Sequence, residues 1–155
     1  MVYASTITVA ANTLEGDATR TVLPVTNGVV WLIEVDFPPG CMGLAHVQLF
    51  DGKYQLAPAS MDESFHGDNV TYSFDDLYLK HSAPFEFVVK TWNLDEVWPH
   101  GIQVRVGMAS TEAFMSRYMP SVSWEKFGEL MARAAVEQER VRQEQLTSML
   151  KLLES

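Results

Sequence analysis

Between residues 3 and 108 the chain repeatedly alternates apolar and polar residues, the pattern of strands with one buried face. The same segments are rich in β-branched and aromatic residues. About eight strands are expected, over Tyr3–Ala10, Arg20–Val25, Val29–Phe37, Leu44–Phe50, Tyr54–Ala57, Val70–Phe74, Phe85–Trp92 and Ile102–Met108. Because no helical pattern separates these segments, residues 1–110 are predicted to form an antiparallel β-sandwich of jelly-roll type rather than a parallel sheet.

Turn-forming residues separate the predicted strands. Asn27–Gly28 and Asp51–Gly52 predict tight hairpins, because Asn, Asp and Gly tolerate the positive φ that such turns need. Pro38–Gly40 and His66–Asn69 are expected to be turns as well. The last two strands are predicted to form a hairpin with residues 93–101 as its loop. Strands that follow one another in the chain are therefore expected to pair with each other.

The pattern changes to a helical one after residue 110. Thr111–Tyr118 predicts a short helix within a connecting segment, residues 111–122. Residues 123–155 predict one long helix, for which Ser121 or Ser123 is a suitable N-cap. A helix of about thirty residues is roughly 45 Å long, more than a β-domain of this size can cover. Part of the helix is therefore expected to project or to meet another chain.

The predicted long helix is apolar at both ends and polar in its middle. Its expected interaction residues are Trp124, Phe127, Met131, Val141, Met149, Leu150, Leu152 and Leu153. The pairs Glu129–Arg133 and Arg140–Glu144 are expected to stabilise the exposed middle by a few tenths of a kcal/mol each. These features predict a homo-oligomer, for which a trimer is favoured, or docking of the helix tip into a neighbouring subunit. The alternative is a helix that packs on its own sheet.

Charge and composition exclude several classes of partner. The chain has 155 residues and 47% hydrophobic content, enough for one domain with a core. Its formal charge is −9, and residues 1–122 hold 14 acidic against 6 basic side chains, which disfavours nucleic acid. No apolar run is long enough to cross a membrane, and the first residues do not resemble a signal peptide. The single cysteine, Cys41, excludes an intrachain disulfide and fits a reducing compartment.

The motifs of common enzyme classes are missing, so an enzyme is not expected and no cofactor is predicted. GxSxG, HExxH and glycine-rich phosphate loops do not occur in the sequence. A small cupin-like enzyme would need a metal on His66 or His100, but no two of the four histidines have the spacing of a ligand pair. Calcium is the other metal considered, on the acidic residues Asp62, Glu63, Asp68, Asp75 and Asp76. The simpler interpretation of these carboxylates is a solvated surface.

The segment between the last two predicted strands concentrates polar and aromatic residues. The residues expected to form an interaction loop are Trp92, Asn93, Asp95, Trp98 and His100. In this interpretation Asn93 and Asp95 turn the chain, and the aromatic side chains cover the end of the sandwich. The alternative function is a carbohydrate-binding module, in which exposed Trp92 and Trp98 stack on the sugar rings of a surface glycan.

A gapped pattern in residues 65–108 resembles a known group of proteins. The pattern consists of Phe65–Asp68, Phe74–Asp76, Pro84, Trp92–Asp95, His100 and Val104–Val106. It is similar to small β-sandwich proteins encoded among the virion genes of tailed phages and prophages. The resemblance implies a non-enzymatic virion component, such as a head-decoration, cement, fibre or tail-accessory subunit, made in the host cytoplasm. Its implied partners are copies of itself and other virion proteins, and no catalytic residues are implied.

Overall fold

The computed structural model describes residues 1–154, and the chain divides into two compact units, Met1–Met108 and Ala109–Ser155. The first unit is a sandwich of nine strands. They are β1 (Val2–Val9), β2 (Thr19–Pro24), β3 (Gly28–Phe37), β4 (Ala45–Asp51), β5 (Tyr54–Ala57), β6 (Phe65–His66), β7 (Val70–Lys80), β8 (Glu86–Asn93) and β9 (His100–Ala109). A short 3-10 helix, Glu15–Asp17, lies between β1 and β2. The predicted antiparallel β-sandwich is therefore confirmed.

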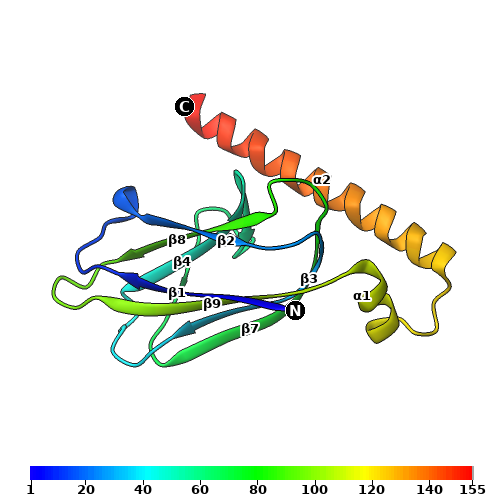
Figure 1. Ribbon diagram of the computed structural model, residues 1–155. Helices are drawn as coiled ribbons and strands as arrows, with labels where there is room; N and C mark the ends of the chain where they lie inside the picture. The colour runs from blue at the N-terminus through cyan, green and yellow to red at the C-terminus, as the bar shows by residue number, and fades with distance from the viewer. Residues whose placement is uncertain (155) are drawn as a thin grey trace. The chain divides into compact units, whose positions relative to one another are not determined.

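The two sheets of the sandwich have the strand orders β1-β9-β3-β7 and β2-β8-β4-β5, with β6 added beside β4 (Figure 1). Apart from the two-residue β6, β1 pairs with β9, β2 with β8, β3 with β7 and β4 with β5. This nested antiparallel pairing is the jelly-roll topology, in which two Greek keys form two packed sheets. The jelly-roll prediction is therefore also confirmed.

The jelly-roll pairing corrects two predicted hairpins. Only Asp51–Gly52 joins neighbouring strands that pair, β4 with β5, and Gly52 there has φ +60°. At Asn27–Gly28 the chain passes from β2, which pairs with β8, to β3, which pairs with β7. The segment between β8 and β9 likewise crosses from one sheet to the other, so it is not a hairpin loop. Turn residues bend the chain in both cases, but they do not determine which strands pair.

The core lies between the inner faces of the two sheets. Its fully buried members include Ile33, Phe37, Leu49, Phe87 and Ile102, which come from both sheets. Burying a side chain of this size contributes about 1.5–3 kcal/mol. The alternation that predicted the strands therefore corresponds to the faces that pack together.

Strand β7 is longer than the predicted Val70–Phe74, because it continues through Asp75 and Asp76 to Lys80. Opposite β3 the register shifts by one residue between Val30 and Leu32, so β7 contains a β-bulge in which two residues oppose one. The adjacent aspartates end the simple alternation at this bulge. The short strand β6 was not predicted, and its second residue, His66, is the first residue of the predicted turn His66–Asn69.

A buried ion pair lies near the end of β7. Lys80 Nζ is 2.6 Å from Asp51 Oδ1, and the two side chains are 2% and 10% exposed. The Tyr78 hydroxyl donates to Asp51 Oδ2 at 2.6 Å. The Lys80 ammonium also lies 5.6 Å from the centre of the Phe87 ring. The sequence analysis did not identify this pair, because Lys80 and Asp51 are 29 residues apart.

The second unit contains α1 (Thr111–Tyr118) and α2 (Trp124–Glu154), so both predicted helices are confirmed. The hydroxyl of Ser110 caps α1 by accepting from the Ala113 amide. The Ser123 hydroxyl accepts from the Lys126 amide, which makes Ser123 rather than Ser121 the N-cap of α2.

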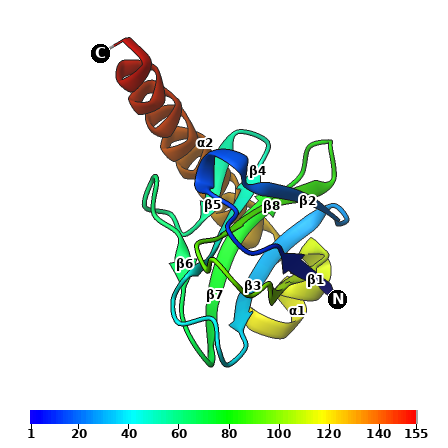
Figure 2. The same ribbon diagram turned by 90° about the vertical axis from the view of Figure 1, so that its left-hand side faces the viewer.

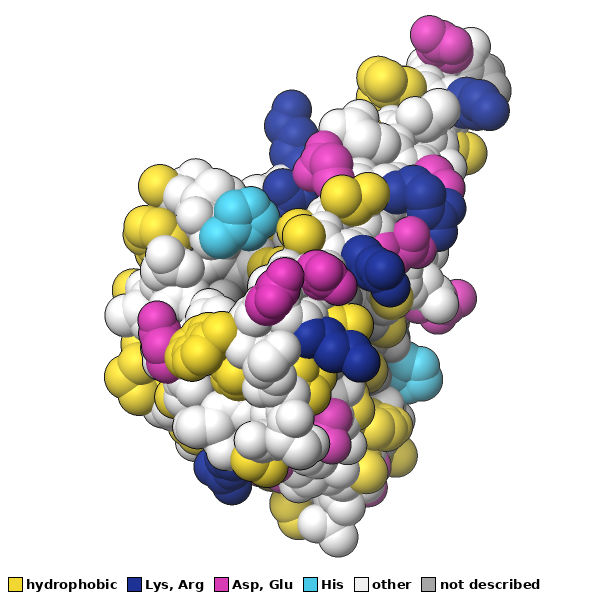
Figure 3. All heavy atoms as spheres, turned by 90° about the vertical axis from the view of Figure 1, so that its right-hand side faces the viewer, with side chains coloured by type: hydrophobic (Ala, Val, Ile, Leu, Met, Phe, Trp, Pro, Cys, Tyr) yellow, Lys and Arg dark blue, Asp and Glu magenta, His cyan; other side chains and the backbone are white. Residues whose placement is uncertain are grey.

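Helix α2 carries mixed charges along its length, and basic and acidic side chains lie side by side over it in Figure 3. Arg140 forms the predicted ion pair with Glu144 and a second one with Glu137 at 2.5 Å. Within residues 1–154, Glu129 and Arg133 form no ion pair, so that prediction is wrong. No helix in this range combines the length and the apolar character needed to cross a membrane.

Candidate functional site

Four loops at one end of the jelly roll form a connected surface, which we call the loop end. It comprises residues 10–18, 38–44, 67–69 and 94–99, which lie together away from the N-terminus in Figure 1 and face the viewer in Figure 2. Backbone hydrogen bonds connect the loops. The Asn12 amide donates to Asp95 O at 2.6 Å, and the amides of Leu94 and Gly43 donate to Leu44 O and Gly67 O. The four loops therefore form one hydrogen-bonded layer.

Asn93 and Asp95 hold the loop of residues 94–99. Asn93 is fully buried; its Nδ2 donates to Trp98 O at 2.9 Å, and its Oδ1 accepts from the Asp95 amide at 3.0 Å. Asp95 Oδ1 accepts from the amides of Val97 and Trp98, and Oδ2 lies 2.9 Å from His100 Nε2. These backbone bonds, followed by His100, hold the pKa of Asp95 below its usual value. The polar cluster of this segment thus orders its own backbone.

Asp68 orders the loop of residues 38–44 by accepting hydrogen bonds from its backbone, as Asp95 does for residues 94–99. Its Oδ1 accepts from the Gly40 amide at 2.7 Å and the Met42 amide at 3.1 Å. The bond from Met42, followed by that from Gly40, lowers the pKa of Asp68. Burial and then the charge of Asp68 raise the pKa of the nearby Cys41 thiol, which stays protonated and serves as a packed side chain.

The ordered loops present apolar side chains to solvent. Trp98 is 67% exposed. The other exposed apolar residues of the loop end are Leu14, Met42, Leu94 and Val97. Exposed apolar groups on a backbone fixed by hydrogen bonds can bind a partner with little loss of loop entropy. Of this surface, the sequence analysis identified only Trp98, since a lone Leu or Met in a loop carries no periodic signal.

Trp92 is not part of this surface. It is 5% exposed, and its ring stacks on that of His46 with centroids 5.0 Å apart and planes at 2°. The Lys90 ammonium lies 5.1 Å from the Trp92 ring centre, and the His66 ring is 5.1 Å from His46. The prediction of Trp92 as an exposed sugar-binding platform is therefore wrong. Trp92 is buried because it lies opposite His46, where β8 pairs with β4.

The stacked His46 predicts a pH-dependent stability. Burial and then the neighbouring His66 lower the pKa of His46 below 6.5, against a smaller opposing effect of Glu15. The folded state then binds a proton less readily than the unfolded state, so stability is full above about pH 6.5 and decreases as the pH falls below it. Urea unfolding between about pH 7.5 and 5 should show this decrease.

Two variants isolate the contribution of His46. His46→Phe should flatten the dependence on pH, whereas His81→Phe, at an exposed histidine, should retain it. An unchanged slope in His46→Phe would assign the effect to another group.

The structure separates the residues considered as metal ligands. His66 packs on His46, and His100 pairs with Asp95. Asp68 binds backbone amides, and Asp75 and Asp76 lie on β7. In the part of the chain that the structure describes, no group of three or more His, Cys, Asp or Glu side chains is placed to hold a metal ion. No serine, threonine or cysteine of residues 1–154 is hydrogen-bonded to His100.

The expected interaction residues of α2 fall into two groups. Phe127 is buried, and its ring is T-shaped to that of the exposed Trp124. Met131 and Val141 are partly buried. Near the C-terminal end Met149, Leu150, Leu152 and Leu153 are exposed, as is Val136 in the middle of the helix. The C-terminal tip thus presents four exposed apolar side chains close together.

Comparison of the chain with protein-family models, with curated proteins and with solved structures found no match.

Proposed function

We propose that the protein is a non-enzymatic structural subunit that associates with copies of itself through α2 and contacts other components through the loop end. The observation that carries the proposal is the apolar tip of α2, with Leu150 61% and Leu153 82% exposed. A 31-residue helix with an ion-paired middle does not need such side chains for its own stability. They are suited to burial against another subunit.

A virion location is the second part of the proposal. It rests on the resemblance of residues 65–108 to virion accessory proteins of tailed phages. The jelly roll is compatible with that role, since capsid domains use it, although many other proteins do as well. In such a particle the helix would join the copies, and the exposed Trp98 of the loop end would contact a neighbouring virion protein.

The helix tip can be tested by its effect on assembly. Light scattering after size exclusion should show an oligomer, with about three times the 17.4 kDa of one chain for the favoured trimer. Leu153→Asp should weaken association about a hundredfold, because a carboxylate would be buried in an apolar contact.

The matched control is Ala132→Asp, which adds the same charge at an exposed position of the same helix outside the apolar tip. It should leave association within about threefold of the unchanged chain. A monomeric unchanged chain, or equal losses in the two variants, would contradict assembly through the tip.

A further inference from the structure

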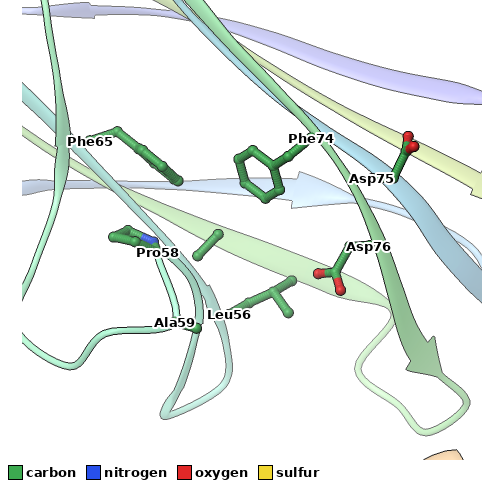
Figure 4. A pocket seen from close by; sticks show the side chains of 8 residues that line it. Leu56, Pro58, Ala59, Phe65, Phe74, Asp75 and Asp76 are labelled. Carbon is green, nitrogen blue, oxygen red and sulfur yellow. The ribbon is translucent and has the colours of Figure 1, made fainter.

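An open cavity lies at one edge of the jelly roll, between the edge strands β5 and β7. Its volume is about 380 Å³, near the lower end of the range for small-molecule sites. Leu56 and Pro58 contribute from β5 and the segment after it, and Phe65 contributes from β6. Phe74, Asp75 and Asp76 border it from β7 (Figure 4). The cavity is thus open and mainly apolar, and two aspartates, Asp75 and Asp76, border it.

Asp76 lies at the bulge in β7. Phe74 and Asp76 project from the same side of the strand, whereas the side chain of Asp75, which also borders the cavity, projects from the other side (Figure 4). Since the extra residue of the bulge opposes the step between Val30 and Leu32, Asp76 lies where the strand is locally distorted. Bulges of this kind often redirect a side chain at a functional position.

Asp76 is partly buried and has no cationic partner among the described residues. Burial raises the pKa of its carboxyl group. Its Oδ1 accepts from the Leu77 amide at 2.7 Å, and within residues 1–154 no Lys, Arg or His side chain forms an ion pair with it. By contrast, the buried carboxylate of Asp51 has both a lysine and a tyrosine. Asp76 therefore retains an oxygen, Oδ2, for a cationic ligand.

The apolar lining indicates that the rest of the ligand is apolar. The rings of Phe65 and Phe74 are 5.6 Å apart at an angle of 37°, and both border the cavity. Aromatic faces attract both an apolar body and a cation. One free carboxylate oxygen suits the single contact of an ammonium group better than the paired contacts of a guanidinium.

We propose that the cavity between β5 and β7 binds a small primary amine, with its ammonium group at Asp76 and its apolar body against Phe65 and Phe74. The site lies wholly within Met1–Met108, and it does not depend on assembly through α2.

Amide-resolved NMR with phenethylamine and its neutral analogue phenethyl alcohol tests the site on the full chain. The amine should produce saturable shifts at Phe65, Phe74 and Asp76, and the alcohol should bind about tenfold more weakly. Absence of saturable shifts at these residues, or equal binding of the two compounds, would overturn the proposal. This comparison needs no variant.

Two variants then test whether the charge of Asp76 is what binds the amine. Asp76→Asn retains an oxygen for the Leu77 amide but removes the charge, so it should weaken amine binding about tenfold and leave alcohol binding unchanged. Asp17→Asn removes the same charge from an exposed aspartate that does not border the cavity, and it should change amine binding by no more than about twofold. Equal losses in the two variants would show general attraction by the acidic surface and would refute the site.

Discussion

Lys80→Met is expected to lower the free energy of unfolding by about 3–5 kcal/mol, because it leaves the carboxylate of Asp51 buried without its cation. Lys80 is 2% exposed and 2.6 Å from Asp51. The Tyr78 hydroxyl would remain as a partner, but a neutral donor does not compensate a buried negative charge. Urea unfolding followed by tryptophan fluorescence measures the change.

Lys53→Met provides the matched control, since Lys53 is exposed in the turn between β4 and β5. It should change stability by less than about 0.5 kcal/mol. The double variant Lys80→Met with Asp51→Asn should recover part of the loss, because no buried charge then remains unpaired. A loss of less than about 1 kcal/mol in Lys80→Met would show that water reaches Asp51 in solution.

Asn93→Ala is expected to destabilise the protein by about 2–4 kcal/mol. The substitution removes the bonds that Asn93 makes to the Trp98 carbonyl and the Asp95 amide, and it leaves buried polar groups without partners. Because the same bonds fix the loop of residues 94–99, amide exchange at Val97 and Trp98 should also become faster. Hydrogen exchange combined with urea unfolding detects both effects.

Asn27→Ala is a suitable control, because Asn27 is exposed in the connection between β2 and β3. Its effect should stay within about 0.5 kcal/mol, with unchanged exchange in residues 94–99. If Asn93→Ala lost stability but kept slow exchange at Val97 and Trp98, the order of the loop would have to come from Asp95 instead.

Strand positions were largely predictable, because they depend on local alternation. The predicted strand Tyr54–Ala57 has the same bounds as β5. The predicted bounds of β3 and β8 differ from the observed ones by no more than one residue at either end. The prediction failed at β7, where Asp75 and Asp76 interrupt the alternation. A bulge depends on the opposite strand, in this case β3, so local periodicity did not indicate it.

Strand pairing was not predictable from the turns. Asn27–Gly28 and Asp51–Gly52 have similar local chemistry, yet only the second closes a hairpin. The difference arises because β2 and β3 belong to different sheets and pair with distant strands, β8 and β7. Such choices depend on contacts across the whole domain rather than on a four-residue window.

The candidate surfaces were only partly predictable for the same reason. Asn93, Asp95 and Trp98 were singled out by their residue types, but the part each plays depends on loops that lie elsewhere in the chain. Trp92 and Trp98 look equivalent in the sequence, yet one stacks on His46 and the other is exposed. Their exposure depends on which strand or loop lies beside each ring.

The sequence by itself determined the β-rich body, the approximate strand positions, both helices and the apolar tip of α2, because these follow from periodicity, caps and composition. Only the tertiary structure decided the jelly-roll pairing, the Lys80–Asp51 pair, the burial of Trp92 and the cavity at Asp76. Each of these joins residues that are far apart in the chain. Their positions depend on how the two sheets pack, which no local pattern encodes.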